Sequence, residues 1–209
     1  MRRFLAALAL ATASLASNAA TADIAPDALA RSVTDEVLAI VRSDKDLQAG
    51  NRDRMMQVVE TKILPHFNFL RMTQLAVGRN WRQATAEQQK ELTEQFKTLL
   101  VRTYTTAFTQ YRNETVEFKP LRMNPGETDV IVKSLVKRPT GQPLAVDYRM
   151  EKTGASWKVY DVIIEGVSLI ENYRGTFNTE IQRSGVDGLI KVLVDKNRLL
   201  ATQQTAAKR

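Results

Sequence analysis

Two residues of this 209-residue sequence have side chains whose type and setting could carry chemistry, Asp161 and His66. Asp161 lies in the strand-like segment Trp157–Ile164, on the same alternating face as the apolar Trp157 and Val159. Its carboxylate is therefore expected to point toward an apolar side, where burial would raise its pKa and suit it to act as a general base. The alternative is a position near a sheet edge or an ion pair with a basic residue, and we favour that alternative.

His66 is the only histidine, and the sequence contains no cysteine. A single histidine cannot form a typical zinc site unless carboxylates complete it. The sequence also lacks the G-x-S-x-G elbow of serine hydrolases and both glycine-rich phosphate-binding motifs. The residues therefore predict no catalytic site, no metal and no cofactor, and they give His66 a structural or exposed role.

The first half of the chain has the spacing of helices, with apolar residues three and four positions apart. The predicted helices are Pro26–Val41, Arg52–Leu64 with Asn51 as a cap, Phe67–Val77 ending at Gly78, and a long helix from a Thr85/Gln88 capping box to about Tyr111. Two further helices are predicted near the end of the chain, one from a Ser168/Glu171 capping box and a final one from Ser184 to about Leu199.

Between these helices the apolar period changes to two, which is typical of strands. The predicted strands are Thr115–Leu121, Thr128–Val136, residues 144–150 and Trp157–Ile164. Short turns join them, so we expect an α+β fold with a four-stranded antiparallel curved sheet wrapped by helices, a cone with an apolar interior. Whether the facing apolar surfaces touch or enclose a pocket is not encoded in the pattern, and a filled core is the more frequent outcome.

The first 22 residues have the anatomy of a secretory signal peptide. A basic start at Met1-Arg2-Arg3 precedes the apolar run Phe4–Ala16, and Ala20-Thr21-Ala22 offers a cleavage site. We therefore expect an exported, soluble protein whose mature part, residues 23–209, is a single domain. The full sequence has a net charge of +7, and the mature part, which lacks Arg2 and Arg3, keeps (30 − 2) − 23 = +5. This excess suits anionic lipid surfaces or acidic partners, whereas nucleic acid is not expected because no basic cluster with interleaved aromatics occurs.

Several blocks of the sequence together resemble one family. Trp157–Arg174 reads W-K-V-Y-D-V-I-I-E-G-V-S-L-I-E-N-Y-R, and Gly185–Leu189 reads G-V-D-G-L. With I-L-P-H-F at Ile63–Phe67 and V-G-R-N-W-R-Q-A-T-A-E-Q-Q at Val77–Gln89, they resemble the MlaC family, also called the toluene-tolerance auxiliary family. The resemblance covers nearly all of the predicted mature chain. Asn68 departs from it, because many relatives have Asp there.

This resemblance implies a non-enzymatic phospholipid carrier in the periplasm, with lipid as cargo. The family shuttles phospholipid between an outer-membrane lipoprotein–porin complex and an inner-membrane MCE-domain protein of an ABC transporter, which maintains the lipid asymmetry of the outer membrane. It also implies a cone-like fold with a deep apolar pocket for the lipid tails. Such a carrier is physically reasonable, because exposing a buried CH₂ group to water costs about 0.8 kcal/mol.

Strand parity and helical faces, placed inside the implied fold, give the predicted lipid-binding pocket. Its residues are Phe69, Leu75, Leu100, Tyr104, Phe108, Val146, Tyr148, Met150, Val159, Val162, Val167, Leu169, Ile170 and Tyr173. Arg149 and Arg174 are considered as partners of the lipid head group, and Gly166 as a hinge or simply the end of a strand. Two alternatives stay open: an enzyme of the ketosteroid-isomerase kind, with a buried carboxylate beside a tyrosine in the cavity, and a lipid-free adaptor with a filled core.

Overall fold

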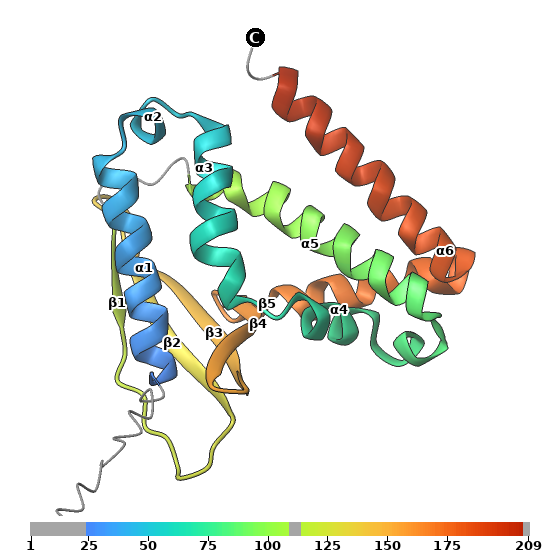
Figure 1. Ribbon diagram of the computed structural model, residues 1–209, viewed down its shortest axis with the longest axis horizontal. Coiled ribbons are helices and arrows are strands. Elements are labelled where there is room, and N and C mark those ends of the chain that lie inside the picture. Colours follow the sequence, from blue (N-terminus) through green and yellow to red (C-terminus); the bar gives the residue numbers. More distant parts are fainter. Residues whose placement is uncertain (1–23, 109–113, 207–209) are drawn as a thin grey trace, which may run out of the picture.

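The computed structural model describes residues 24–108 and 114–206, so the predicted signal peptide lies outside the described residues. Helices come first in the chain (Figure 1). They are α1 (Pro26–Ser43), α2 (Lys45–Gln48), α3 (Arg52–Val58), the π-helical turn η1 (Val59–Ile63), the 3₁₀ turn η2 (Leu64–His66), α4 (Phe69–Val77), the 3₁₀ turn η3 (Gly78–Gln83) and α5 (Ala86–Phe108).

The helix starts predicted at Asn51 and Thr85 are confirmed by hydrogen bonds, whereas the helix predicted from Phe67 begins only at Phe69, after a cap at Asn68. The Oδ1 atom of Asn51 accepts the backbone N–H of Arg54 at 3.0 Å, which caps α3. Before α5, Gln88 Oε1 accepts the N–H of Thr85 at 2.9 Å while Thr85 Oγ1 accepts the N–H of Gln88 at 3.2 Å, a complete capping box. The prediction of a regular helix to Leu64 is wrong in its last turn, because the chain widens there into η1.

The sheet is antiparallel in the order β1 to β5, which confirms the α+β fold. Its strands are β1 (Thr115–Phe118), β2 (Asp129–Lys137), β3 (Leu144–Thr153), β4 (Ser156–Ile164) and β5 (Val167–Ser168). The predicted number of four strands is one too few, because the chain turns back at Gly166 and adds β5 to the edge of β4. Ser168, predicted to begin a helix, is therefore also the last residue of a strand.

The chain after β5 forms α6 (Leu169–Ala206), which is interrupted once. At Gly185 the backbone has φ 72° and ψ −176°, a conformation that residues with a Cβ rarely adopt. The helix kinks there, and its second arm runs back above α5 (Figure 1). The two predicted helices therefore correspond to the two arms, with the break one residue after the predicted cap at Ser184.

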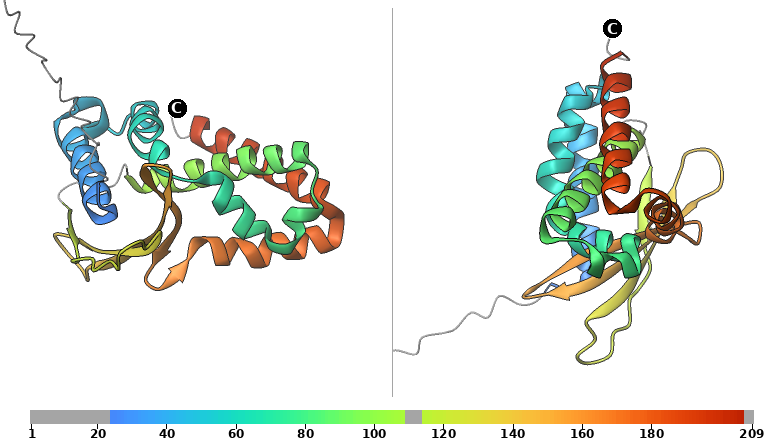
Figure 2. Two further views of the ribbon diagram at one scale, coloured as in Figure 1. Left: turned by 60° about the horizontal axis from the view of Figure 1, so that its bottom comes forward. Right: turned by 90° about the vertical axis from the view of Figure 1, so that its right-hand side faces the viewer.

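These elements form two halves (Figure 2). In the sheet half, α1 and α3 lie over one face of the curved sheet. In the helical half, α4, η3, α6 and the first part of α5 pack on one another around buried Phe96, Leu92 and Phe177. The second part of α5 connects the two halves. None of the described helices combines the length and the apolar character needed to cross a membrane.

Candidate functional site

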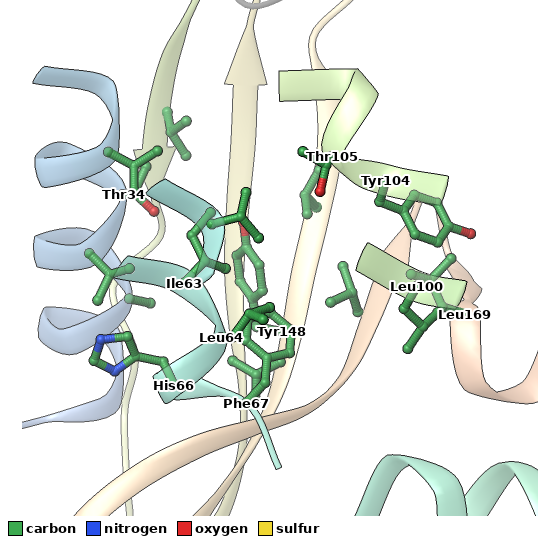
Figure 3. Close-up of a pocket in the computed structure, with 18 of the residues that line it drawn as sticks. Thr34, Ile63, Leu64, His66, Phe67, Leu100, Tyr104, Thr105, Tyr148 and Leu169 are labelled. Carbon is green, nitrogen blue, oxygen red and sulfur yellow. The ribbon is translucent and has the colours of Figure 1, made fainter. Parts of the chain in front are cut away.

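The sheet half encloses an apolar cavity of about 340 Å³ between the sheet, α1, η1 and the second part of α5 (Figure 3). Its volume is at the lower end of the range of small-molecule sites, about 300–1,000 Å³. The lining side chains are Leu29, Ala30, Val33, Thr34, Val37, Leu38, Val41, Val59, Ile63, Leu64, His66, Phe67, Phe69, Met72, Leu100, Val101, Tyr104, Thr105, Val116, Val136, Leu144, Val146, Tyr148, Met150, Val159, Val162, Ile164 and Leu169.

One wall of the cavity comes from α1 and η1. On α1 the lining residues recur three and four positions apart from Leu29 to Val41, so a single helical face covers the cavity. The π-helical turn supplies Ile63 and is followed by Leu64, and Figure 3 shows these side chains facing Leu100 across the cavity. A π-helical turn is rare and often occurs at functional sites, and here it shapes a cavity wall.

The opposite wall is the inner face of β3 and β4. Tyr148 lies opposite Val162 in the ladder, but two positions later Met150 lies opposite Val159. Tyr160 is thus an extra residue in β4, a β-bulge that reverses the alternation of side chains. Val159 and Val162 have opposite parity in the sequence, and the bulge allows both to line the cavity.

The same bulge decides the position of Asp161. Its register partner is Arg149, whose neighbours in β3 line the cavity, so Asp161 lies on the other face of the sheet. The residue is 1% exposed; Oδ2 accepts a hydrogen bond from the Ser168 hydroxyl at 2.6 Å, and Oδ1 accepts one from the backbone N–H of Ile170 at 3.2 Å. Arg149 Nη1 is 4.0 Å from Oδ2. Asp161 thus attaches the start of α6 to β4, and the expectation that it shares a face with Val159 is wrong.

Few polar groups reach the cavity. They belong to Thr34, His66, Tyr104, Thr105 and Tyr148, and no carboxylate occurs among the described residues that line it. Burial, followed by the nearby Lys158 ammonium, lowers the pKa of His66 from its ordinary value of 6.5, which favours the neutral imidazole. Such a lining suits a largely apolar ligand, and its described residues offer no carboxylate as a general base. In the described part of the chain, no group of three or more potential metal ligands occurs either.

Two of the three tyrosines predicted for the pocket, Tyr104 and Tyr173, are neighbours where the halves join. Tyr104 lines the cavity, whereas Tyr173 packs edge-on against Phe96 at 5.0 Å between ring centroids. Burial, followed by the neighbouring Tyr104 hydroxyl, raises the pKa of Tyr173 to about 12. Its hydroxyl therefore stays neutral at ordinary pH.

Most of the predicted pocket residues lie around the cavity. Those that line it are Phe69, Leu100, Tyr104, Val146, Tyr148, Met150, Val159, Val162 and Leu169. Their contact with lipid remains a prediction. The side chain of Phe108 lies outside the described residues.

Four predicted residues do not line this cavity. Leu75, Ile170 and Tyr173 pack in the helical core instead, because the faces of α4 and α6 that carry them turn toward α5. Val167 is 59% exposed, since it lies in the added strand β5. The two arginines considered for the head group also lie elsewhere: Arg149 faces Asp161, and Arg174 packs beside Gly78.

Sequence reasoning missed the wall formed by α1 and η1. The spacing of Leu29, Val33 and Val37 did identify an apolar helical face. The spacing did not identify the surface that lies opposite this face, because that surface depends on how α1 packs over the sheet. The pattern alone is equally consistent with a helix in a filled core.

Comparison with known proteins identifies the family. A sequence model of the MlaC protein family matches residues 31–195. The chain belongs to the MlaC family. The blocks at Ile63–Phe67, Val77–Gln89 and Trp157–Arg174, on which the resemblance was based, all fall inside the matched region.

Individual relatives agree with membership of the MlaC family. The toluene tolerance protein ttg2D of Pseudomonas putida is 32% identical over 106 residues, which span 51% of this chain and 49% of that protein. The intermembrane phospholipid transport system binding protein MlaC of Haemophilus influenzae is 24% identical over 155 residues, 69% of this chain and 72% of that protein.

A solved structure is similar over most of the chain. It is that of a phospholipid-binding protein from Ralstonia solanacearum, in complex with a phospholipid. The TM-score is 0.78 and the sequences are 45% identical, covering 84% of this chain and 98% of the other. The similarity therefore includes both halves of the fold.

Proposed function

We propose that this protein is a phospholipid carrier that holds the acyl chains of its cargo in the cavity of the sheet half. The observation that carries the proposal is the cavity itself, whose walls are formed almost entirely by apolar side chains. The phospholipid bound to the 45% identical Ralstonia solanacearum protein supports it.

The energetics of lipid transfer favour such a cavity. Two acyl chains of roughly sixteen carbons each, at about 0.8 kcal/mol per CH₂ group, cannot cross water unshielded at a useful rate. An apolar cavity removes this barrier, while the scarcity of polar groups in its lining leaves the head group to be solvated at the surface.

A more specific part of the proposal is the location of the carrier and the route of its lipid. The basic start and apolar run of residues 1–22 support export to the periplasm. There the protein would exchange phospholipid between an outer-membrane lipoprotein–porin complex and an inner-membrane MCE-domain transporter, and so maintain outer-membrane lipid asymmetry. The name of the Haemophilus influenzae relative, an intermembrane phospholipid transport system binding protein, supports this route.

The two alternatives fit the geometry less well. A lipid-free adaptor requires a filled core, whereas the sheet half contains a cavity of about 340 Å³. An isomerase-like enzyme requires a carboxylate beside a cavity tyrosine. The buried Asp161 is instead on the other face of the sheet, where its oxygens hold Ser168 and the N–H of Ile170.

Native mass spectrometry of protein purified from periplasm without detergent tests the proposal, combined with lipid extraction from the same sample. We expect a bound mass that resolves into a two-chain phospholipid at about one per protein. If the protein is free of lipid, it is then offered phospholipid vesicles. Failure to take up lipid from them would overturn the carrier function and favour the adaptor.

A further inference from the structure

A second recess lies on the helical half, between η3 and the first arm of α6. It is lined by Val77, Gly78, Arg79, Glu171, Arg174, Gly175 and Asn178. It shares no residue with the lipid cavity. The α6 residues recur three and four positions apart, so one helical face forms a wall of the recess, and the end of α4 with η3 forms the other.

The guanidinium group of Arg174 is held in this recess by packing on a glycine. Gly78 ends α4 with φ +63°, and a Cβ at this position would lie 3.3 Å from Arg174 Nε and 3.5 Å from Nη2. The side chain of Arg174 thus occupies the space that any other residue at position 78 would fill. The negative end of the α4 dipole favours a cation here as well.

Both arginines of the recess retain their hydrogen-bonding capacity. Within the described part of the chain, no ion pair or hydrogen bond engages the side chain of Arg79 or Arg174. The carboxylate of the recess, that of Glu171, lies 3.9 Å from Arg149. Asn178 is oriented by Asn80, whose Nδ2 donates to its Oδ1 at 3.4 Å. Two guanidinium groups therefore face a recess in which nothing neutralises them directly.

We propose that this recess binds a carboxylate side chain from an acidic segment of a docking protein. Guanidinium groups form paired, charge-assisted hydrogen bonds with carboxylates. Arg79 and Arg174 contribute two positive charges and Glu171 one negative charge, so the lining matches a single carboxylate better than a phosphate dianion. A flat bilayer surface fits a recess between two elements less well than a protruding side chain does.

The inference rests on the proposed carrier function, which requires the protein to dock on a partner while its lipid leaves. The helical half suits such docking, because its core residues are buried and the recess shares no lining residue with the cavity. A partner held at the recess leaves the walls of the sheet half free to move. The recess therefore supplies attachment without blocking the cavity.

The experiment is an NMR titration of the purified protein with a hexaglutamate peptide at low salt, with hexaglutamine as the neutral control. We expect hexaglutamate to shift the backbone amides of Gly78, Gly175 and Asn178. Arg79→Gln and Arg174→Gln should each weaken binding about tenfold, because each removes one charged partner of the carboxylate. The matched control is Arg183→Gln, on the same helix outside the recess and paired with Glu180 at 2.6 Å, which should bind as the wild type does.

Three outcomes of the peptide titration would overturn the inference. They are the absence of shifts at the recess, equal shifts with hexaglutamine, and binding that neither recess variant weakens. Arginine-dependent binding to vesicles of phosphatidylglycerol without any response to the peptide would also overturn it, in favour of a membrane contact. Bound phospholipid, measured in the same samples, should be unchanged in both variants. A wild type that neither carries lipid nor takes it up from vesicles would count against the carrier function and leave the recess result standing.

Discussion

The two halves of this protein bury the same kinds of side chains but pack them differently. In the helical half, Phe96 is fully buried and contacts Tyr173 and Phe177 edge-on, with both ring centroids 5.0 Å away. In the sheet half, the apolar face of α1 and the inner face of β3 and β4 both line the cavity. The difference is one of distance between apolar surfaces rather than of composition.

This difference separates stability from function. Close packing maximises dispersion contacts and leaves no space for a ligand, whereas two apolar walls held apart lose some of these contacts and gain a binding site. The filled helical half supplies a rigid frame, and α5 together with the Asp161 attachment holds the cavity walls against it. Substitutions in the two halves should therefore have different consequences.

The largest effect is expected from Phe96→Ala in the helical core. The loss of a fully buried ring and the void left behind should lower the free energy of unfolding by about 3–5 kcal/mol. The matched control is Phe69→Ala, because Phe69 is partly buried at the edge of the helical core and also lines the cavity, so its truncation enlarges a space that already exists. It should lose about 1–2 kcal/mol in lipid-free protein, without a new enclosed void. Urea unfolding measures both, and equal losses would contradict the difference between the halves.

The next largest effect is expected at the attachment between β4 and α6. Asp161→Ala removes a buried acceptor and leaves the Ser168 hydroxyl and the Ile170 N–H without their partner, which should cost about 2–4 kcal/mol. Asp161→Asn keeps the shape and one acceptor oxygen, so it should lose less than the alanine variant. Urea unfolding distinguishes the two, and an alanine variant as stable as the wild type would show that the attachment contributes nothing.

The fold could be predicted from the sequence where local patterns determine it. The three- and four-residue spacing of apolar residues in α5 fits only a helix, and the alternation in β2 fits only a strand. Asn51 and Thr85 mark helix starts through hydrogen bonds to residues three positions later. These features do not depend on distant parts of the chain. In contrast, the turn at Gly166 and the two-residue β5 depend on tertiary structure, because β5 exists only through its pairing with β4.

The candidate site was harder to predict for the same physical reason. Strand parity correctly placed Tyr148 and Met150 on the cavity side, but the bulge at Tyr160 reversed the parity in β4 and moved Asp161 to the other face. Such an irregularity adapts β4 to its neighbours and leaves no local signal. Parity and helical period also give the direction of a side chain without the distance to the opposite wall, so a cavity and a filled core have the same pattern.

A smaller effect, on binding rather than stability, is expected when the cavity is filled. Val162→Trp places a large ring in the cavity and should lower the amount of co-purified phospholipid about tenfold. The matched control is Ile131→Trp, since Ile131 is 39% exposed and lies opposite Arg149, away from the cavity. Lipid extraction and native mass spectrometry give the occupancy, and circular dichroism checks that both variants fold. Full occupancy in Val162→Trp would place the lipid elsewhere.

The smallest effect concerns the pH dependence of the sheet half. Burial lowers the pKa of His66 below its ordinary value of 6.5, with Lys158 acting in the same direction and Glu36 against it. The unfolded chain then binds a proton more readily than the folded chain between these two pKa values. The stability contributed by neutral His66 is therefore fully present above pH 6.5 and is lost as the pH falls through the lowered pKa.

His66→Gln isolates this contribution, because glutamine stays neutral throughout. Wild type and variant are compared by urea unfolding of lipid-free protein at about pH 7.5 and about pH 5.5, a range that spans the usual titration of histidine. The wild type should lose more stability between the two values than the variant does. Identical losses would show that the imidazole is as well solvated in the cavity wall as in the unfolded chain. The titration of one side chain thus reports whether the cavity of lipid-free protein is as apolar as its lining.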